Sequence, residues 1–165
     1  MNGNHAASEH SFEGVSIMGG NKASSEHYFS TQAITREAAM ALIAASREAS
    51  REIGIEVAIA IVDPAGNLKA FERTDDSSFL ASDIAIDKAW TAVTFGLGTH
   101  QWVDVLADRN AAQLAHRPRL VAAGGGYPIK VGGKLIGGLG ISGGNYAQDQ
   151  KACEVALAQL GFDVA

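Results

Sequence analysis

Length, composition and charge point to a single-domain protein without a polyanionic partner. The 165 residues suffice for one well-packed domain but not for two ordinary ones. The formal net charge is −5 and no basic cluster is present, which argues against binding nucleic acid. No apolar stretch approaches the roughly 20 residues that span a bilayer, and the N-terminus lacks a secretory pattern, so we expect a cytoplasmic protein without membrane contact. Cys153, the single cysteine, excludes an internal disulfide.

The first part of the chain differs in composition from the rest. Residues 1–33 are rich in Gly, Ser, Asn and His and show no sustained helical or strand period. This composition predicts a flexible arm, whose few apolar side chains could also pack on the domain or on a neighbouring subunit. We expect the folded domain to occupy residues 34–165.

A long helix and a β-hairpin are predicted at the start of this domain. Apolar residues recur every three to four positions after Thr35, which suits an N-cap, and Gly54 suits the end of the helix. Residues 57–61 alternate in the manner of a strand. The Asp-Pro-Ala-Gly-Asn turn at 63–67 then reverses the chain, and residues 68–73 return as a second strand.

Two further helices are expected in the middle of the chain. The first runs from Phe79 to about Phe95 and carries Lys88 within its otherwise apolar inner stripe. The second covers residues 99–116 and is stopped by Pro118.

The last third predicts a second hairpin and a final helix. Residues 129–131 and 134–141 flank a Gly-Gly dipeptide, which permits a tight turn. Asn145 and Gln148 form a capping pair for the helix that follows. Because tight turns join antiparallel strands, the predicted fold is α+β, with a mainly antiparallel sheet and helices layered against it.

The glycine-rich segment at residues 138–143 matches G-x-G-x-x-G after a predicted strand. We reject a dinucleotide site, because too few residues follow for the second strand of a βαβ unit. The glycines instead indicate a close approach of the backbone to a helix or to a ligand. The amides of Ser142, Gly143 and Gly144, beside the positive end of the final helix, could bind a carboxylate, although turn geometry alone would also explain the glycines.

Lys88 is the most informative single residue. A lysine in an apolar stripe either extends to the surface or is held by a partner. Asp149 lies on the buried face of the final helix, in its first turn, and would form a desolvated pair with Lys88 if the two meet. Such a pair is either structural or anchors an acidic ligand and moves a proton. The second alternative predicts that Lys88→Ala and Asp149→Ala abolish ligand binding and leave the fold intact, whereas unfolding of both would make the pair structural.

His100, Asp104 and Asp108 recur four residues apart. On a helix they would share one face and offer metal-ligand chemistry, but a solvated polar face explains them equally well. We therefore predict no metal site. No Ser-His-Asp order or nucleophile elbow is present.

Four segments together resemble the GlcG/HbpS/PduO-C-terminal family. They are VDPAGNL at 62–68, DIAIDKAWTA at 83–92, GGGYPI at 124–129, and GGLGISGG at 137–144 followed by Asp149. They look like the family patterns VD-x-x-G-x-L, IA-x-x-KA-x-TA, GG-x-PI and G-x-x-GVSGG-x-x-x-x-D. Their order and spacing span nearly the whole predicted domain.

The resemblance implies a profilin-like domain with a five-stranded antiparallel sheet flanked by helices, usually assembled into a homo-oligomer. It also implies a small-molecule pocket near the helix of Lys88, the Gly124–Tyr127 segment and the loop at 142–149. The candidate catalytic residues are then Lys88, Asp149 and Tyr127. The candidate ligand-binding residues are Thr91, Gly125, Gly126, Ser142, Gly143 and Gly144.

The first function that this resemblance implies, and the one the polar candidates favour, is a cofactor-free enzyme. A small organic acid or carbonyl compound would lie against the glycine-rich amides and Lys88, while Asp149 or Tyr127 transfers protons in a lyase, hydratase or isomerase reaction. No cofactor would be needed.

The alternative function is binding or degradation of haem or a related tetrapyrrole. His27, His100, His116 and Tyr127 are the possible axial ligands, and none of the histidines occupies a family motif position. A third, weaker possibility is a non-catalytic assembly module.

Overall fold

The structure is a computed structural model, and it describes residues 27–164. Residues from Gln32 onward form one compact unit. Residues 27–31 belong to a separate unit and contain no helix or strand. Most of the arm expected at residues 1–33 lies outside the described residues, so the arm and its boundary remain predictions.

The compact unit alternates helices with two hairpins. In chain order its elements are α1 (Arg36–Ile53), β1 (Ala58–Val62), β2 (Leu68–Arg73), α2 (Phe79–Phe95), α3 (Trp102–Ala107), the 3₁₀ helix η1 (Ala112–His116), β3 (Gly126–Val131), β4 (Lys134–Ser142) and α4 (Tyr146–Gln159). None of the described helices is long and apolar enough to cross a membrane.

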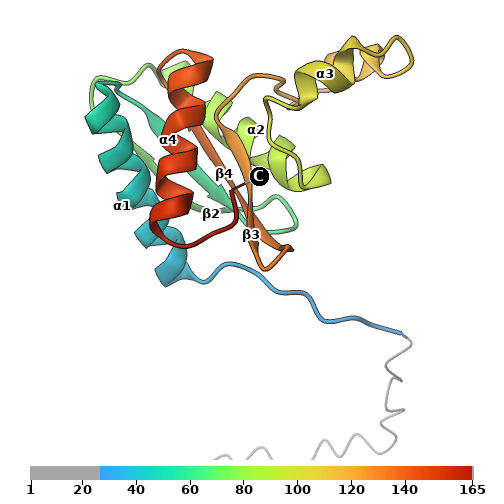
Figure 1. The fold of residues 1–165 in the computed structure, drawn as a ribbon, viewed down its shortest axis with the longest axis horizontal. Coiled ribbons are helices and arrows are strands. Elements are labelled where there is room, and N and C mark those ends of the chain that lie inside the picture. Colours follow the sequence, from blue (N-terminus) through green and yellow to red (C-terminus); the bar gives the residue numbers. More distant parts are fainter. Residues whose placement is uncertain (1–26, 165) are drawn as a thin grey trace, which may run out of the picture. The chain divides into compact units, whose positions relative to one another are not determined.

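The strands form one antiparallel sheet in the order β2-β1-β4-β3. Helices α1 and α4 lie side by side over one face, and α2 packs on the other (Figure 1). This confirms the α+β prediction, but the described residues contain four strands, not the expected five. Two segments approach the sheet without adding a strand, because each makes a single backbone hydrogen bond: Ile34 N to Ile136 O (2.8 Å) and Asp163 N to Lys130 O (3.0 Å).

The two faces of the sheet differ in side-chain size, because β1 alternates large and small residues. Ile59 and Ile61 pack toward α1 and α4, whereas Ala58 and Ala60 face α2. In the neighbouring β4, a Cβ added to Gly140 would clash with the Ala85 carbonyl of α2 and lie 2.7 Å from the Ala89 amide nitrogen. The G-x-G pattern therefore serves the close approach of a helix to the sheet.

Helix ends follow the sequence signals closely. The Thr35 hydroxyl accepts from Ala38 N at 3.1 Å, and Gly54 ends α1 in the left-handed conformation. Asn145 and Gln148 form a full capping box at the start of α4. These caps confirm the predicted start and end of the first helix and the predicted start of the last helix.

The prediction of one continuous helix over residues 99–116 is wrong. Two short helices, α3 and η1, replace it, with a turn between them. Asp108 breaks the helix because it adopts an extended conformation and its Oδ1 accepts from Asn110 N at 2.9 Å, in the manner of an Asx turn. His100, Asp104 and Asp108 consequently share no helix face, and no cluster of three metal-ligating side chains occurs among residues 27–164.

Candidate functional site

Lys88 and Asp149 meet in the interior, so the desolvated pair that their sequence positions suggested is formed. Lys88 Nζ lies 2.7 Å from Asp149 Oδ2 and donates to Ile141 O at 2.9 Å. Both side chains are nearly inaccessible, at 4% and 3% exposure. Helix α2 supplies the ammonium, the first turn of α4 supplies the carboxylate, and β4 supplies the carbonyl. The pair therefore links both helical layers through the sheet.

The second carboxylate oxygen of Asp149 is bound by an amide of the glycine-rich loop. Asp149 Oδ1 accepts from Gly144 N at 2.9 Å. Burial raises the pKa of Asp149 above its ordinary value, although the Lys88 ammonium and the Gly144 and Gly143 amides favour the ionised form. The anion site predicted at this loop is thus partly filled by the protein's own carboxylate.

The other predicted glycines pack around this pair. A Cβ on Gly125 would lie 2.6 Å from Asp149 Cβ and 2.7 Å from Lys88 Nζ. Gly126 donates its amide to the Thr99 hydroxyl at 2.8 Å, and a Cβ on Gly143 would clash with the Glu56 carbonyl. These three glycines therefore serve close packing, which leaves Ser142 and Gly144 as the predicted loop residues that border a hollow.

That hollow has a volume of about 530 Å³ and opens to solvent. Lys88, Ser142 and Asp149 line it, together with residues 120–123 and Tyr146. The volume falls in the range typical of small-molecule sites. The structure thus brings Lys88, Asp149, Ser142 and Gly144 together beside one accessible cavity.

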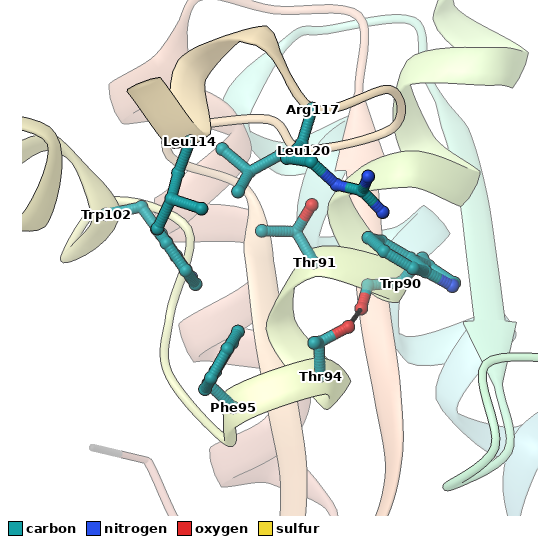
Figure 2. A pocket seen from close by; sticks show the side chains of 8 residues that line it. All are labelled: Trp90, Thr91, Thr94, Phe95, Trp102, Leu114, Arg117 and Leu120. Carbon is teal, nitrogen blue, oxygen red and sulfur yellow. Dashed lines mark hydrogen bonds between the residues drawn. The ribbon is translucent and has the colours of Figure 1, made fainter. Parts of the chain in front are cut away.

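Thr91 does not line this hollow, and its hydroxyl instead holds the segment at residues 119–121 by two hydrogen bonds. Its hydroxyl donates to Arg119 O at 3.0 Å and accepts from Val121 N at 3.1 Å. The side chain is buried on the wall of a different, apolar pocket (Figure 2). Its polar atom is already satisfied, so a contact between this hydroxyl and a ligand remains a prediction.

Replacing Thr91 by valine should therefore destabilise the fold by about 1–2 kcal/mol, because the half-buried Val121 amide loses its acceptor. Urea denaturation measures the loss, and faster hydrogen exchange at Val121 would locate it. Thr94→Val is the matched control, since the exposed Thr94 hydroxyl only returns to Trp90 O in its own helix. Equal stabilities of the two variants would contradict the assigned role of Thr91.

Tyr127, the third catalytic candidate, belongs to a separate polar cluster. Its hydroxyl donates to Glu154 Oε1 at 2.7 Å, and Gln150 Nε2 donates to the same oxygen at 3.0 Å. Burial, followed by the hydrogen bond to Glu154, raises the Tyr127 pKa above its ordinary value. Partial burial raises the Glu154 pKa, but the hydrogen bonds from Tyr127 and Gln150 outweigh this and bring it below its usual range. Tyr127 is therefore held as a neutral phenol.

His100 lies against this cluster. Its ring centroid is 5.3 Å from that of Tyr127, and the side chain is half-buried. The turn that carries it is fixed by a hydrogen bond from Thr99 N to Gly126 O, and a Cβ on Gly98 would lie 2.8 Å from His100 Nδ1. Nδ1 is buried and has no hydrogen-bond partner among the described residues.

A second hollow, of about 440 Å³, borders His100. Its walls include Val103, Ala122, Ala123 and Tyr146. Ala122, Ala123 and Tyr146 also line the hollow beside Lys88, so the two hollows adjoin. We call this combined feature the shared groove; it extends from the His100 imidazole to the Lys88–Asp149 pair.

Sequence reasoning missed much of this groove. Ala122, Ala123 and Tyr146 carry no chemical signal in the sequence, and Glu154 and Gln150 fall outside any recognised motif. Only the pairing of Glu154 with Gln150 at i,i−4 spacing on one helix could have drawn attention to them.

Comparison with known proteins supplies the identity of the fold. Residues 34–158 match the family described as haem degrading protein HbpS-like. The chain belongs to the HbpS-like family. A relative of this HbpS-like chain is an uncharacterized 15.0 kDa protein from the dhaT-dhaS intergenic region of Citrobacter freundii, 37% identical over 127 residues, which cover 75% of this chain and 89% of the relative.

Two solved structures share the fold of this HbpS-like chain. The PduOC:heme complex superposes with a TM-score of 0.73 at 32% identity, covering 79% of this chain and 97% of the other. HbpS superposes with a TM-score of 0.78 at 28% identity, covering 84% and 98%. The resemblance expected from the four sequence segments is thereby confirmed for the family, and for the fold as far as its antiparallel α+β architecture.

Proposed function

We propose that this HbpS-like protein binds haem or a related tetrapyrrole in the shared groove, with the His100 imidazole as an axial ligand. The observation that carries the proposal is the position of His100. Its ring forms part of the wall of an accessible hollow, and its buried Nδ1 has no partner among the described residues. The family description and the PduOC:heme relative support a tetrapyrrole as the ligand.

The walls of the groove suit a flat, largely apolar molecule. Val103, Ala122, Ala123 and Tyr146 offer aliphatic and aromatic surface, and the glycine-rich loop leaves the far end open. A bound haem would supply an iron atom, and the His100 imidazole is the group of this chain that would hold it. The chain's own contribution is to hold His100 through the Gly98–Gln101 turn and to surround the ligand with these walls.

The other candidate ligands fit less well. The Tyr127 oxygen is engaged by Glu154, and its raised pKa keeps it protonated. His116 is exposed on η1 and lines neither hollow of the groove, and His27 belongs to the separate unit before Gln32. His100 is therefore the histidine of the described residues whose ring lines the groove.

Titration with haemin tests the proposal. We expect a saturable, shifted Soret band that weakens at least tenfold in His100→Ala and persists in the matched control His116→Ala. Circular dichroism should show an unchanged fold in both variants, because neither imidazole donates or accepts a hydrogen bond in the described structure. A Soret response that is non-saturating, or that is indifferent to His100→Ala, would contradict the proposal.

A small organic acid at the other end of the groove is the second candidate. The observation that favours it is that Lys88, Ser142 and Asp149 line the same open hollow. Under this alternative, glycolate or acetate raises the melting temperature while haemin gives no saturable band. Proton transfer by Asp149 in a cofactor-free reaction belongs to the same alternative.

A further inference from the structure

The described chain contains a further pocket, whose lining shares only Leu120 with that of the shared groove (Figure 2). Helix α2 provides one wall, and α3, η1 and the segment after η1 provide the rest. Its volume is about 240 Å³, and its surface is overwhelmingly apolar. The aromatic rings of Trp90, Phe95 and Trp102 line it, together with Leu114 and Leu120.

The aromatic rings that line this pocket contact one another and a neighbouring arginine. Phe95 and Trp102 meet edge to face with centroids 5.3 Å apart, and in Figure 2 Trp102 projects between Leu114 and Phe95. Trp90 is held from outside by the Arg119 guanidinium, 4.8 Å from the ring centroid. Phe95 and Leu114 remain 66% and 39% exposed, so the apolar walls lack a covering partner within the described chain.

This pocket has one buried polar atom without a partner and one exposed cation in its lining. Trp102 is 3% exposed, yet its Nε1 is buried without an acceptor among residues 27–164. Arg117 borders the mouth, and its guanidinium lies beside Trp90 in Figure 2. Arg117 forms no ion pair within the described part of the chain, in contrast to Arg119, which binds Asp87 at 2.8 Å. The pocket thus combines an apolar interior with a solvent-exposed cation that has no protein carboxylate beside it among the described residues.

This combination selects a class of ligand. A cavity of about 150 Å³ admits a benzene ring, so 240 Å³ admits one ring with a substituent. A carboxylate on that ring would compensate Arg117, while the ring replaces water on the aromatic walls. No His, Cys, Met or Tyr lines this pocket, so it offers no axial ligand for haem.

We propose that the pocket between α2, α3 and η1 binds a small aromatic or alicyclic carboxylate, with its ring among Trp90, Phe95 and Trp102 and its carboxylate at Arg117. This site has no lining residue in common with the hollow that borders His100. Its occupation would fix η1 and the following segment against α2, because those elements supply opposite walls.

Tryptophan fluorescence reports directly on this pocket, because both tryptophans of the chain line it. Cyclohexanecarboxylate is a suitable probe, since it does not absorb where tryptophan is excited. We expect a saturable change in emission with a Kd on the order of 1 mM or below. Cyclohexylmethanol, which lacks the charge, should bind more weakly to the unmodified protein.

Arg117→Gln should weaken binding of the carboxylate about threefold to fivefold and leave binding of the alcohol unchanged, as expected for a partly exposed ion pair. Arg109→Gln is the matched control, because Arg109 is exposed and does not line the pocket. Haemin titration of Arg117→Gln, followed by the Soret band, should match the unmodified protein. A failure at this pocket is thereby distinguished from a failure at His100.

Three outcomes would overturn the proposal. The first is the absence of a saturable emission change, and the second is an equal effect of Arg117→Gln on acid and alcohol. The third is an emission spectrum that shifts with protein concentration in step with the oligomeric state measured by light scattering. That result would assign the apolar walls to a second copy of the chain.

Discussion

Lys88→Met should destabilise the protein by about 3–5 kcal/mol. The substitution leaves the Asp149 carboxylate buried with the Gly144 amide and without its cation. Removing one member of a buried ion pair has a cost of this order, because the remaining charge is desolvated and uncompensated. Urea denaturation measures the effect as a lower midpoint with an unchanged slope.

The pH dependence of this loss identifies its cause. Without Lys88, burial raises the pKa of Asp149 further above the unfolded value of about 3.9, so folding favours the protonated acid. The penalty is therefore absent below about pH 4 and grows as the pH rises through the folded pKa. A deficit that did not shrink on acidification would point to lost packing instead of a stranded charge.

Two further variants separate a structural pair from a ligand anchor. In Lys88→Met/Asp149→Asn the stranded charge is removed, so we expect recovery of most of the loss. Lys134→Met, at an exposed position on β4, should change stability by less than about 0.5 kcal/mol. If Lys88→Met instead stays within about 1 kcal/mol of the parent and only ligand binding is lost, the pair serves the ligand.

Gly140→Ala should prevent stable folding or reduce the free energy of unfolding by more than about 3 kcal/mol. The added methyl group would overlap the Ala85 carbonyl and approach the Ala89 amide, both backbone atoms of α2. Backbone atoms of a packed helix cannot rotate away, so the helix must separate from the sheet. That movement would also displace Lys88, which lies between Ala85 and Ala89 in α2. Soluble yield and urea denaturation measure the effect.

Gly132→Ala provides the comparison for this steric argument. Gly132 lies in the β3–β4 turn with φ of 57°, and an added Cβ meets nothing within 4 Å. Its cost should be that of the left-handed conformation alone, about 1 kcal/mol. Comparable stabilities of Gly140→Ala and Gly132→Ala would show that α2 does not pack closely against β4 at Gly140.

The sequence predicts the elements well where local chemistry decides them. Thr35, Gly54 and the Asn145–Gln148 pair mark helix ends, because caps depend on nearby backbone groups. The helix expected at residues 99–116 fails because an Asx turn at Asp108 competes with the helical hydrogen bond at that point.

The candidate site is predicted only in part. Lys88 and Asp149 are conspicuous because charged side chains rarely occupy apolar helix faces, and the structure brings them together. Thr91 and Tyr127 resemble site residues in the sequence, yet their hydroxyls are engaged by Arg119, Val121 and Glu154. Whether a polar atom is free depends on distant partners, which spacing along the chain does not encode.

By itself, then, the sequence determined the family, the antiparallel α+β architecture and the buried charges at residues 88 and 149. These depend on local periodicity, on caps and on short motifs. Only the tertiary structure decided that residues 122, 123 and 146 join two hollows into one groove and that both tryptophans line a second pocket. Cavities arise where separate elements fail to fill the space between them, and that property belongs to their packing and to no single segment.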